Sequence, residues 1–203
     1  DTDLQNTIAA STGVPLVSTN ATVLEFDFVP ISSNFSFDFL FSSEEYGNFQ
    51  CGFGDAFAYL LTNTVTGVTT NLAVVPSTSS PISVVTIRNN VFNSTCSSVN
   101  ETFFDNYYGG ALASGAATNF EGNTVKMTAS AVLTPNVKYH IKLVIADRLN
   151  SENDSAIFIS SQSFNLSQNV LGEDRTLENG KAVCVGASSP DLITGLDPNF
   201  YTF

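Results

Sequence analysis

The stretch Phe35-Ser36-Phe37-Asp38-Phe39-Leu40-Phe41 carries a phenylalanine at every second position. Successive side chains of a β-strand point to opposite faces, so this period of two places all four rings on one side. A face made of aromatic rings is stabilised by burial against other apolar surface. The stretch therefore predicts a strand with one buried face.

Similar signals recur along the chain. Alternation over Val125–Leu133 and Tyr139–Ile145 predicts two more one-sided strands, joined by a turn at Pro135-Asn136. No segment shows a sustained helical period with caps at both ends. Short strands separated by turn residues predict an all-β fold, an antiparallel β-sandwich of jelly-roll-like type with long loops. The other expected strands are Asp55–Leu61, Asn71–Val75, Val84–Ile87 and Ala156–Phe164.

One region departs from this pattern. Asn89–Asn123 is rich in Asn, Ser, Gly and aromatic residues and alternates only weakly, so we interpret it as a long loop. Its aromatic pairs, Phe103-Phe104 and Tyr107-Tyr108, either belong to the core or form an exposed contact surface. We favour the core.

Charge narrows the possible partners. The net charge is −12, and Arg88 is the first basic residue, with eight acidic residues before it. Nucleic acid and anionic membrane surfaces are therefore not expected as partners, because both need clustered Lys or Arg. No stretch is long enough to cross a membrane, and the opening Asp1-Thr2-Asp3 is interpreted as a mature N-terminus. The acidic excess serves either solubility or cation binding.

The cysteines indicate an oxidising compartment. Cys51 and Cys96 lie in polar loops rich in Gly, Ser and Asn, a setting that favours a disulfide. The spacing fits no zinc motif. Cys184 is then left over, and we expect its partner to lie in sequence beyond this chain.

Carboxylates at strand ends are the first candidate site. Glu44 and Glu45 follow the phenylalanine strand, and Asp55 opens the next one beyond a Gly-rich turn. Glu44 and Asp55 are therefore expected to be neighbours across a hairpin. Such carboxylates repel one another unless a cation lies between them, and calcium accepts oxygen ligands from flexible loops. The alternative is that both glutamates are solvated.

A second acidic loop joins two later strands. Asp147 ends one strand, Asp154 opens the next, and the residues between them are mostly polar. The loop is not an EF-hand, and Asp and Asn are also ordinary turn residues. We assign Asp147 and Asp154, with Glu44, Glu45 and Asp55, to a candidate calcium site.

Catalytic motifs are not found in the sequence. Neighbouring strand residues face opposite ways, so Glu44 and Glu45 cannot form a glycosidase pair on one sugar. His140 is the only histidine, and an exposed or hydrogen-bonded strand residue is the simpler interpretation. There is no phosphate loop, nucleophile elbow or metalloprotease helix.

Taken together, several segments resemble the choice-of-anchor L domain, a family found in large exported proteins of Bacteroidetes. The resemblance covers roughly residues 1 to 165, in order. One departure lies in the loop after Asp147. The family pattern often carries a further Asp there, whereas this chain has Arg148 and no Asp before Asp154. The matching segments are Phe39–Gly47, Asp55–Thr62, Asn71–Pro76, Tyr139–Asp147 and Asp154–Phe158.

This resemblance implies a secreted, extracellular protein displayed on the bacterial cell surface. It implies export by the type IX secretion system, and membership among adhesin-like proteins, some of them linked to gliding motility. Expected partners are a cell-surface polysaccharide or protein, including outer-membrane secretion or gliding machinery. A ligand is not implied.

The expected organisation is a β-sandwich domain over residues 1–172, a linker over 173–181, and the start of an incomplete Ig-like domain over 182–203. We expect a non-catalytic, calcium-stabilised adhesin module. The alternatives are a glycan-active jelly-roll enzyme and a structural component of a surface filament or secretion assembly, recognised through strand addition.

Overall fold

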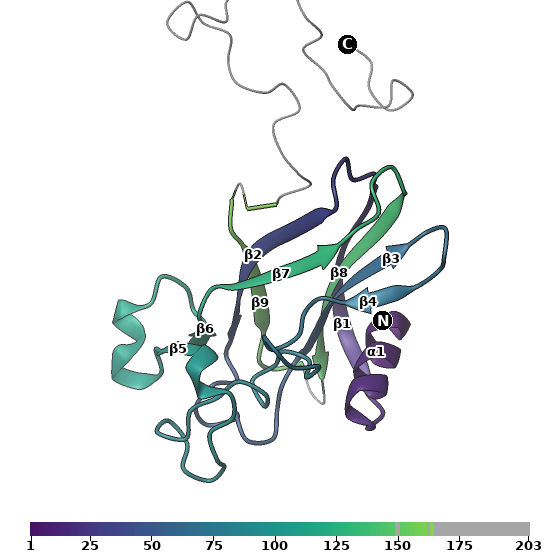
Figure 1. Ribbon diagram of the computed structural model, residues 1–203. Coiled ribbons are helices and arrows are strands. Elements are labelled where there is room, and N and C mark those ends of the chain that lie inside the picture. Colours follow the sequence, from purple (N-terminus) through teal and green to yellow (C-terminus); the bar gives the residue numbers. More distant parts are fainter. Residues whose placement is uncertain (149–150, 162, 165–203) are drawn as a thin grey trace, which may run out of the picture.

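A computed structural model describes residues 1–148, 151–161 and 163–164, and two antiparallel sheets make up most of this part (Figure 1). The predicted all-β class is confirmed. The linker, the expected second domain and Cys184 lie outside the described residues. The elements are α1 (Thr2–Thr12), β1 (Ser18–Phe28), β2 (Asn34–Ser43), β3 (Ala56–Asn63), β4 (Thr69–Asn71), β5 (Phe104–Tyr107), β6 (Gly122–Thr124), β7 (Met127–Val132), β8 (Tyr139–Arg148) and β9 (Ser155–Ile159), with 3-10 turns at Glu101–Phe103 and Gly110–Gly115.

The two sheets are built around different central strands. The first has the order β1-β8-β3-β4, so β1 and β4 are its edge strands in the described chain. The second is built on β2, whose first half pairs with β7 and whose second half pairs with β6 and β9. Consequently β1 and β9 each have one edge without a strand partner among the described residues.

The core lies between the sheets, on the phenylalanine face of β2. The β2 rings are at most 2% exposed, as the alternation predicted. Phe37 and Phe39 pack on Tyr59 of β3 with ring centroids 4.9 and 5.0 Å apart, and Phe41 stacks on Phe57 at 5.4 Å. Interlocked rings at these distances hold the two sheets face to face.

Helix α1 is a feature that the sequence analysis missed. The Asp1 side chain caps it by accepting a hydrogen bond from the Leu4 amide, and Gly13 ends it in the left-handed region. Leu4 and Ile8 are buried on the outer face of the first sheet. Only these two positions carry the apolar period, which is too short to appear as an amphipathic pattern. Lys142 of β8 also pairs with Asp1 and Asp3, both at 2.7 Å.

Two predicted strands are corrected. Val84–Ile87 forms a turn rather than a strand, although Val84 and Ile87 are fully buried. In the predicted strand Asn71–Val75, only Asn71 belongs to β4, and Val74 makes one isolated bridge to Pro81. Pro76 and Pro81, which lie between these two segments, lack backbone donors and keep this region out of a regular ladder.

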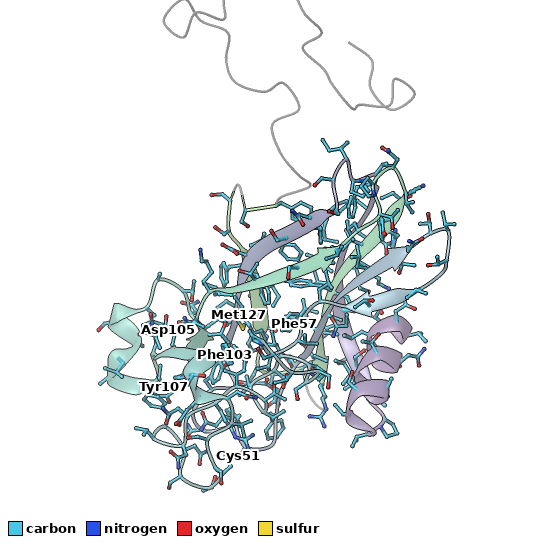
Figure 2. The ribbon with its side chains drawn as sticks, in the orientation of Figure 1. Cys51, Phe57, Phe103, Asp105, Tyr107 and Met127 are labelled. Carbon is cyan, nitrogen blue, oxygen red and sulfur yellow. A yellow bond between two sulfur atoms is a disulfide. The ribbon has the colours of Figure 1, made fainter. Side chains whose placement is uncertain are left out.

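The long loop Asn89–Asn123 contains one strand, β5, and the start of β6. Phe104 is buried, Phe103 packs against the core, and Tyr107 stacks on Phe92 with ring centroids 4.6 Å apart, so the core interpretation is confirmed for these three residues. Tyr108 is only partly buried and is not part of this core cluster. Figure 2 shows Phe103 and Tyr107 beside this part of the core. Gly47 has a φ of 76°, and a Cβ there would overlap the Tyr107 ring, so this position requires glycine.

The predicted disulfide is confirmed. Cys51 and Cys96 are bonded, with their Cα atoms 5.5 Å apart and a sequence separation of 45. The bond links the loop after β2 to the long loop, where the Cys51 sulfur also lies 3.2 Å from the Thr95 hydroxyl. Figure 2 shows Cys51 at the end of the molecule away from the turn that joins β7 and β8.

Removing this disulfide will lower the stability of the protein. For a loop of this length, the chain-entropy model predicts a loss of about 4 kcal/mol for the double variant Cys51→Ser/Cys96→Ser. Chemical denaturation of both forms measures it. The double variant Ser94→Ala/Ser97→Ala, which keeps the bond, is the control. Equal stability of wild type and the cysteine double variant would contradict a structural role for the bond.

Candidate functional site

The candidate carboxylates gather where four strands begin or end. Strands β2 and β8 end near Glu44 and Asp147, while β3 and β9 begin just after Asp55 and Asp154. In the β3–β8 ladder Ala56 pairs with Ala146, and in the β2–β9 ladder Ser43 pairs with Ser155. Both registers bring acidic residues to the same end of the sandwich.

Glu45 and Asp55 form the buried centre of this site. Their side chains are 0% and 1% exposed. The Asp55 amide donates to Glu45 Oε2 at 2.9 Å, which links the end of β2 to the start of β3. Asp55 and Glu44 were expected to be neighbours across a hairpin, but β2 and β3 belong to different sheets, and the contact that the Asp55 amide makes is with Glu45. Within the described residues, Glu45 Oε1 and Asp55 Oδ2 are buried without a hydrogen-bond partner.

Asp147 is the third member of the cluster. It is 8% exposed, and its Oδ2 accepts a hydrogen bond from Asn20 Nδ2 at 2.8 Å. The next amide, that of Arg148, donates to Asp55 Oδ1 at 3.3 Å. Asp147 is close enough for its charge to raise the pKa of both Glu45 and Asp55.

Glu44 and Asp154 lie at the surface beside this cluster and bind each other. The Glu44 amide donates to the Asp154 carbonyl at 3.0 Å, and the Asp154 amide donates to Glu44 Oε2 at 3.1 Å. These reciprocal bonds extend the β2–β9 pairing by one residue. Glu121, which was not predicted as a site residue, also lies near Glu44. Burial raises the pKa of Glu121, and the charge of Glu44 raises it further.

Burial controls the charge of the two central carboxyls. It raises the pKa of Glu45 to about 7, and the charge of Asp55 adds to the effect. Burial also raises the pKa of Asp55 to about 6, with smaller contributions from Asp147 and Asp154. Ionised carboxylates are costly in such a place unless a proton, a cation or hydrogen bonds compensate them.

The cluster is not a complete metal centre by itself. Within residues 1–148, 151–161 and 163–164, no three His, Cys, Asp or Glu side chains are arranged to hold a metal ion. The residues that could contribute to one are Glu45 and Asp55, each through an unpartnered oxygen, together with Asp147. Calcium also accepts backbone carbonyls and water as ligands. Arg148 forms no salt bridge to these carboxylates among the described residues, and its side chain lines a pocket beside α1.

His140 is hydrogen-bonded on the outer face of the first sheet. Its Nδ1 lies 2.8 Å from Asp27 Oδ1, and its ring is partly exposed. Asp27 also pairs with Lys138 at 2.6 Å. The interpretation of His140 as a hydrogen-bonded strand residue is confirmed.

Comparison with known proteins gives one match. Residues 1–165 match the family model of the choice-of-anchor L domain, so the resemblance seen in the sequence is confirmed over the same range. No curated protein and no solved structure matches the chain. Among the described residues, no helix has the length and apolar character needed to span a membrane.

The raised pKa of Glu45 predicts an unusual pH dependence in calcium-free buffer. Between its ordinary value of 4.5 and about 7 the folded chain binds more protons than the unfolded chain. The stability that Glu45 contributes is therefore greatest below the lower value and falls as pH rises through this window, by about 1.4 kcal/mol per unit of pKa difference. Asp55 acts in the same direction up to about pH 6.

Glu45→Gln should remove most of this fall in unfolding free energy with pH. Urea denaturation at pH 5 and pH 8, with chelator present, measures the effect. Exposed Glu101, replaced by Gln, is the matched control. Unfolding free energies of the wild type that are equal at both pH values would refute the assignment.

Proposed function

Because the chain belongs to the choice-of-anchor L family, whose domains are non-enzymatic modules of surface-anchored proteins, we propose that it is a calcium-stabilised module of a large secreted adhesin on the bacterial cell surface. The proposal includes a Bacteroidetes-type host, export by the type IX secretion system and a role in adhesion or gliding-related attachment. The family match over residues 1–165 is the observation that carries it.

Two features support an extracellular site of action. The Cys51–Cys96 disulfide persists in oxidising compartments, where reducing systems of the cytosol are absent. The net charge of −12 and the polar Asn- and Ser-rich loops suit a surface exposed to water. Neither feature identifies a ligand.

The calcium proposal depends on the unpartnered buried oxygens of Glu45 and Asp55. Two buried carboxyls beside Asp147, with none of the three in a salt bridge among the described residues, produce a region of strongly negative potential. A divalent cation would stabilise the ionised forms and occupy the free oxygens, with carbonyl oxygens and water completing its shell.

Calcium is expected to stabilise the folded protein at neutral pH. At a concentration about one hundred times the dissociation constant, binding contributes about 2.7 kcal/mol. For a domain of this size that is a rise in melting temperature of roughly 5–10 °C. Differential scanning fluorimetry in chelator, calcium and magnesium measures the effect.

Matched variants assign the effect to the cluster. Glu45→Gln/Asp55→Asn should be insensitive to calcium, whereas Glu101→Gln and Asp105→Asn, both on exposed residues, should respond as the wild type does. A wild type with the same melting temperature in calcium and chelator would remove calcium from the proposal. The carboxyls would then be held by protons.

The proposed surface role predicts that the module is accessible on intact cells and contributes to attachment. Antibody against residues 1–164 should label unbroken cells. Cells that produce the parent protein without these residues should attach less to surfaces coated with cell-surface polysaccharide or protein. Labelling only after lysis would contradict the location. Unchanged attachment of the deletion strain would contradict the adhesive role.

A further inference from the structure

An apolar groove opens along one side of the sandwich, away from the carboxylate cluster's centre. It has a volume of about 340 Å³ and lies between the inner faces of the two sheets. Leu24 of β1, Leu143 and Ile145 of β8, and Ile157 and Ile159 of β9 form its walls. Leu24 is 56% exposed and Ile159 is 39% exposed, so apolar core surface is left uncovered here in the described chain.

The groove is bordered by two strand edges. Nothing in the described chain pairs with the outer edge of β1 or of β9. From Thr22 to Phe28 the pairing of β1 with β8 is regular, so its other edge offers a continuous row of backbone donors and acceptors. An added strand on β1 would direct every second side chain inward, into the groove.

A buried polar group beside the groove also lacks a partner. Tyr59 lines the groove, and its hydroxyl is buried without a hydrogen-bond partner among the described residues. Burial raises the pKa of Tyr59, so the hydroxyl keeps its proton and can donate. A backbone carbonyl or a threonine hydroxyl would accept that bond, whereas an acyl chain would not.

Charge at the rim restricts the occupant further. Exposed Asp154 immediately precedes the groove residue Ser155, and Glu44 binds beside it. Neither forms a salt bridge within the described residues. An occupant with a basic residue at this end would be favoured, and an acidic one disfavoured.

We propose that this groove is a docking site for an extended peptide strand of another protein, with small apolar side chains at alternate positions and a basic residue at one end. The strand adds to the edge of β1 between Thr22 and Phe28. Its inward side chains fill the space between Leu24 and Ile159, and one of its acceptors binds the Tyr59 hydroxyl. This inference goes beyond the proposed function, which names no contact surface and does not depend on it.

The test uses the full chain and a fluorescein-labelled peptide, Lys-Val-Thr-Val-Thr-Val-Thr-Val-Lys, followed by fluorescence anisotropy. Leu24→Arg places a charge in the groove and should weaken binding by about tenfold or more. Val23→Arg is the matched control. It changes the neighbouring residue on the opposite face of the same strand and should leave the affinity within about twofold. Both positions are more than 40% exposed, so both variants should fold.

Two further measurements keep the proposal falsifiable. The same peptide methylated on alternate backbone nitrogens cannot add to a strand edge and should not bind. Absence of wild-type binding, or equal weakening by Leu24→Arg and Val23→Arg, would overturn the proposal. So would sedimentation showing that the chain forms a dimer that Leu24→Arg dissociates, because a second copy would then occupy the groove.

Discussion

The packing of the β2 phenylalanines against β3 is the constraint on which the rest of the structure depends. Phe37, Phe39 and Phe41 contact Tyr59 and Phe57 across the sandwich, and this contact fixes which face of β2 points inward. Odd-numbered positions therefore face the core. After Ser43 the chain enters a turn, where alternation no longer applies, and Glu45 and Tyr46 are both fully buried there while Glu44 is partly exposed. The turn that follows the phenylalanine strand thus places a carboxyl against the core.

Burial of Glu45 and Asp55 is costly to the fold, so the surrounding contacts must hold them in place. Tyr46 is fully buried next to Glu45, and the Gln50 side chain accepts from the Gly47 amide and donates to the Asn89 carbonyl. The Cys51–Cys96 bond ties the same loop to the long segment before β5. The loop between the two carboxyls is therefore anchored by core packing, hydrogen bonds and a covalent link.

The sequence predicted what depends on local pattern. The phenylalanine face, the sandwich class, the disulfide and the position of five carboxylates at strand ends all follow from alternation, turn residues or loop composition. It did not predict that the Asp55 amide binds Glu45, because Glu44 and Glu45 lie in the turn after β2, where strand alternation no longer decides which side chain is buried. Helix α1 was missed because two buried residues, Leu4 and Ile8, are too few to make a periodic signal. Glu121 was missed because its nearness to Glu44 depends on a contact distant in sequence.

The carboxylate cluster and the groove are connected through β9. Ser155 lines the groove, its hydroxyl donates to that of Ser43 at 2.9 Å, and Asp55 lies close to it. Asp154, one residue earlier, is held by Glu44. The position of β9 therefore depends on contacts that the acidic end of the sandwich provides.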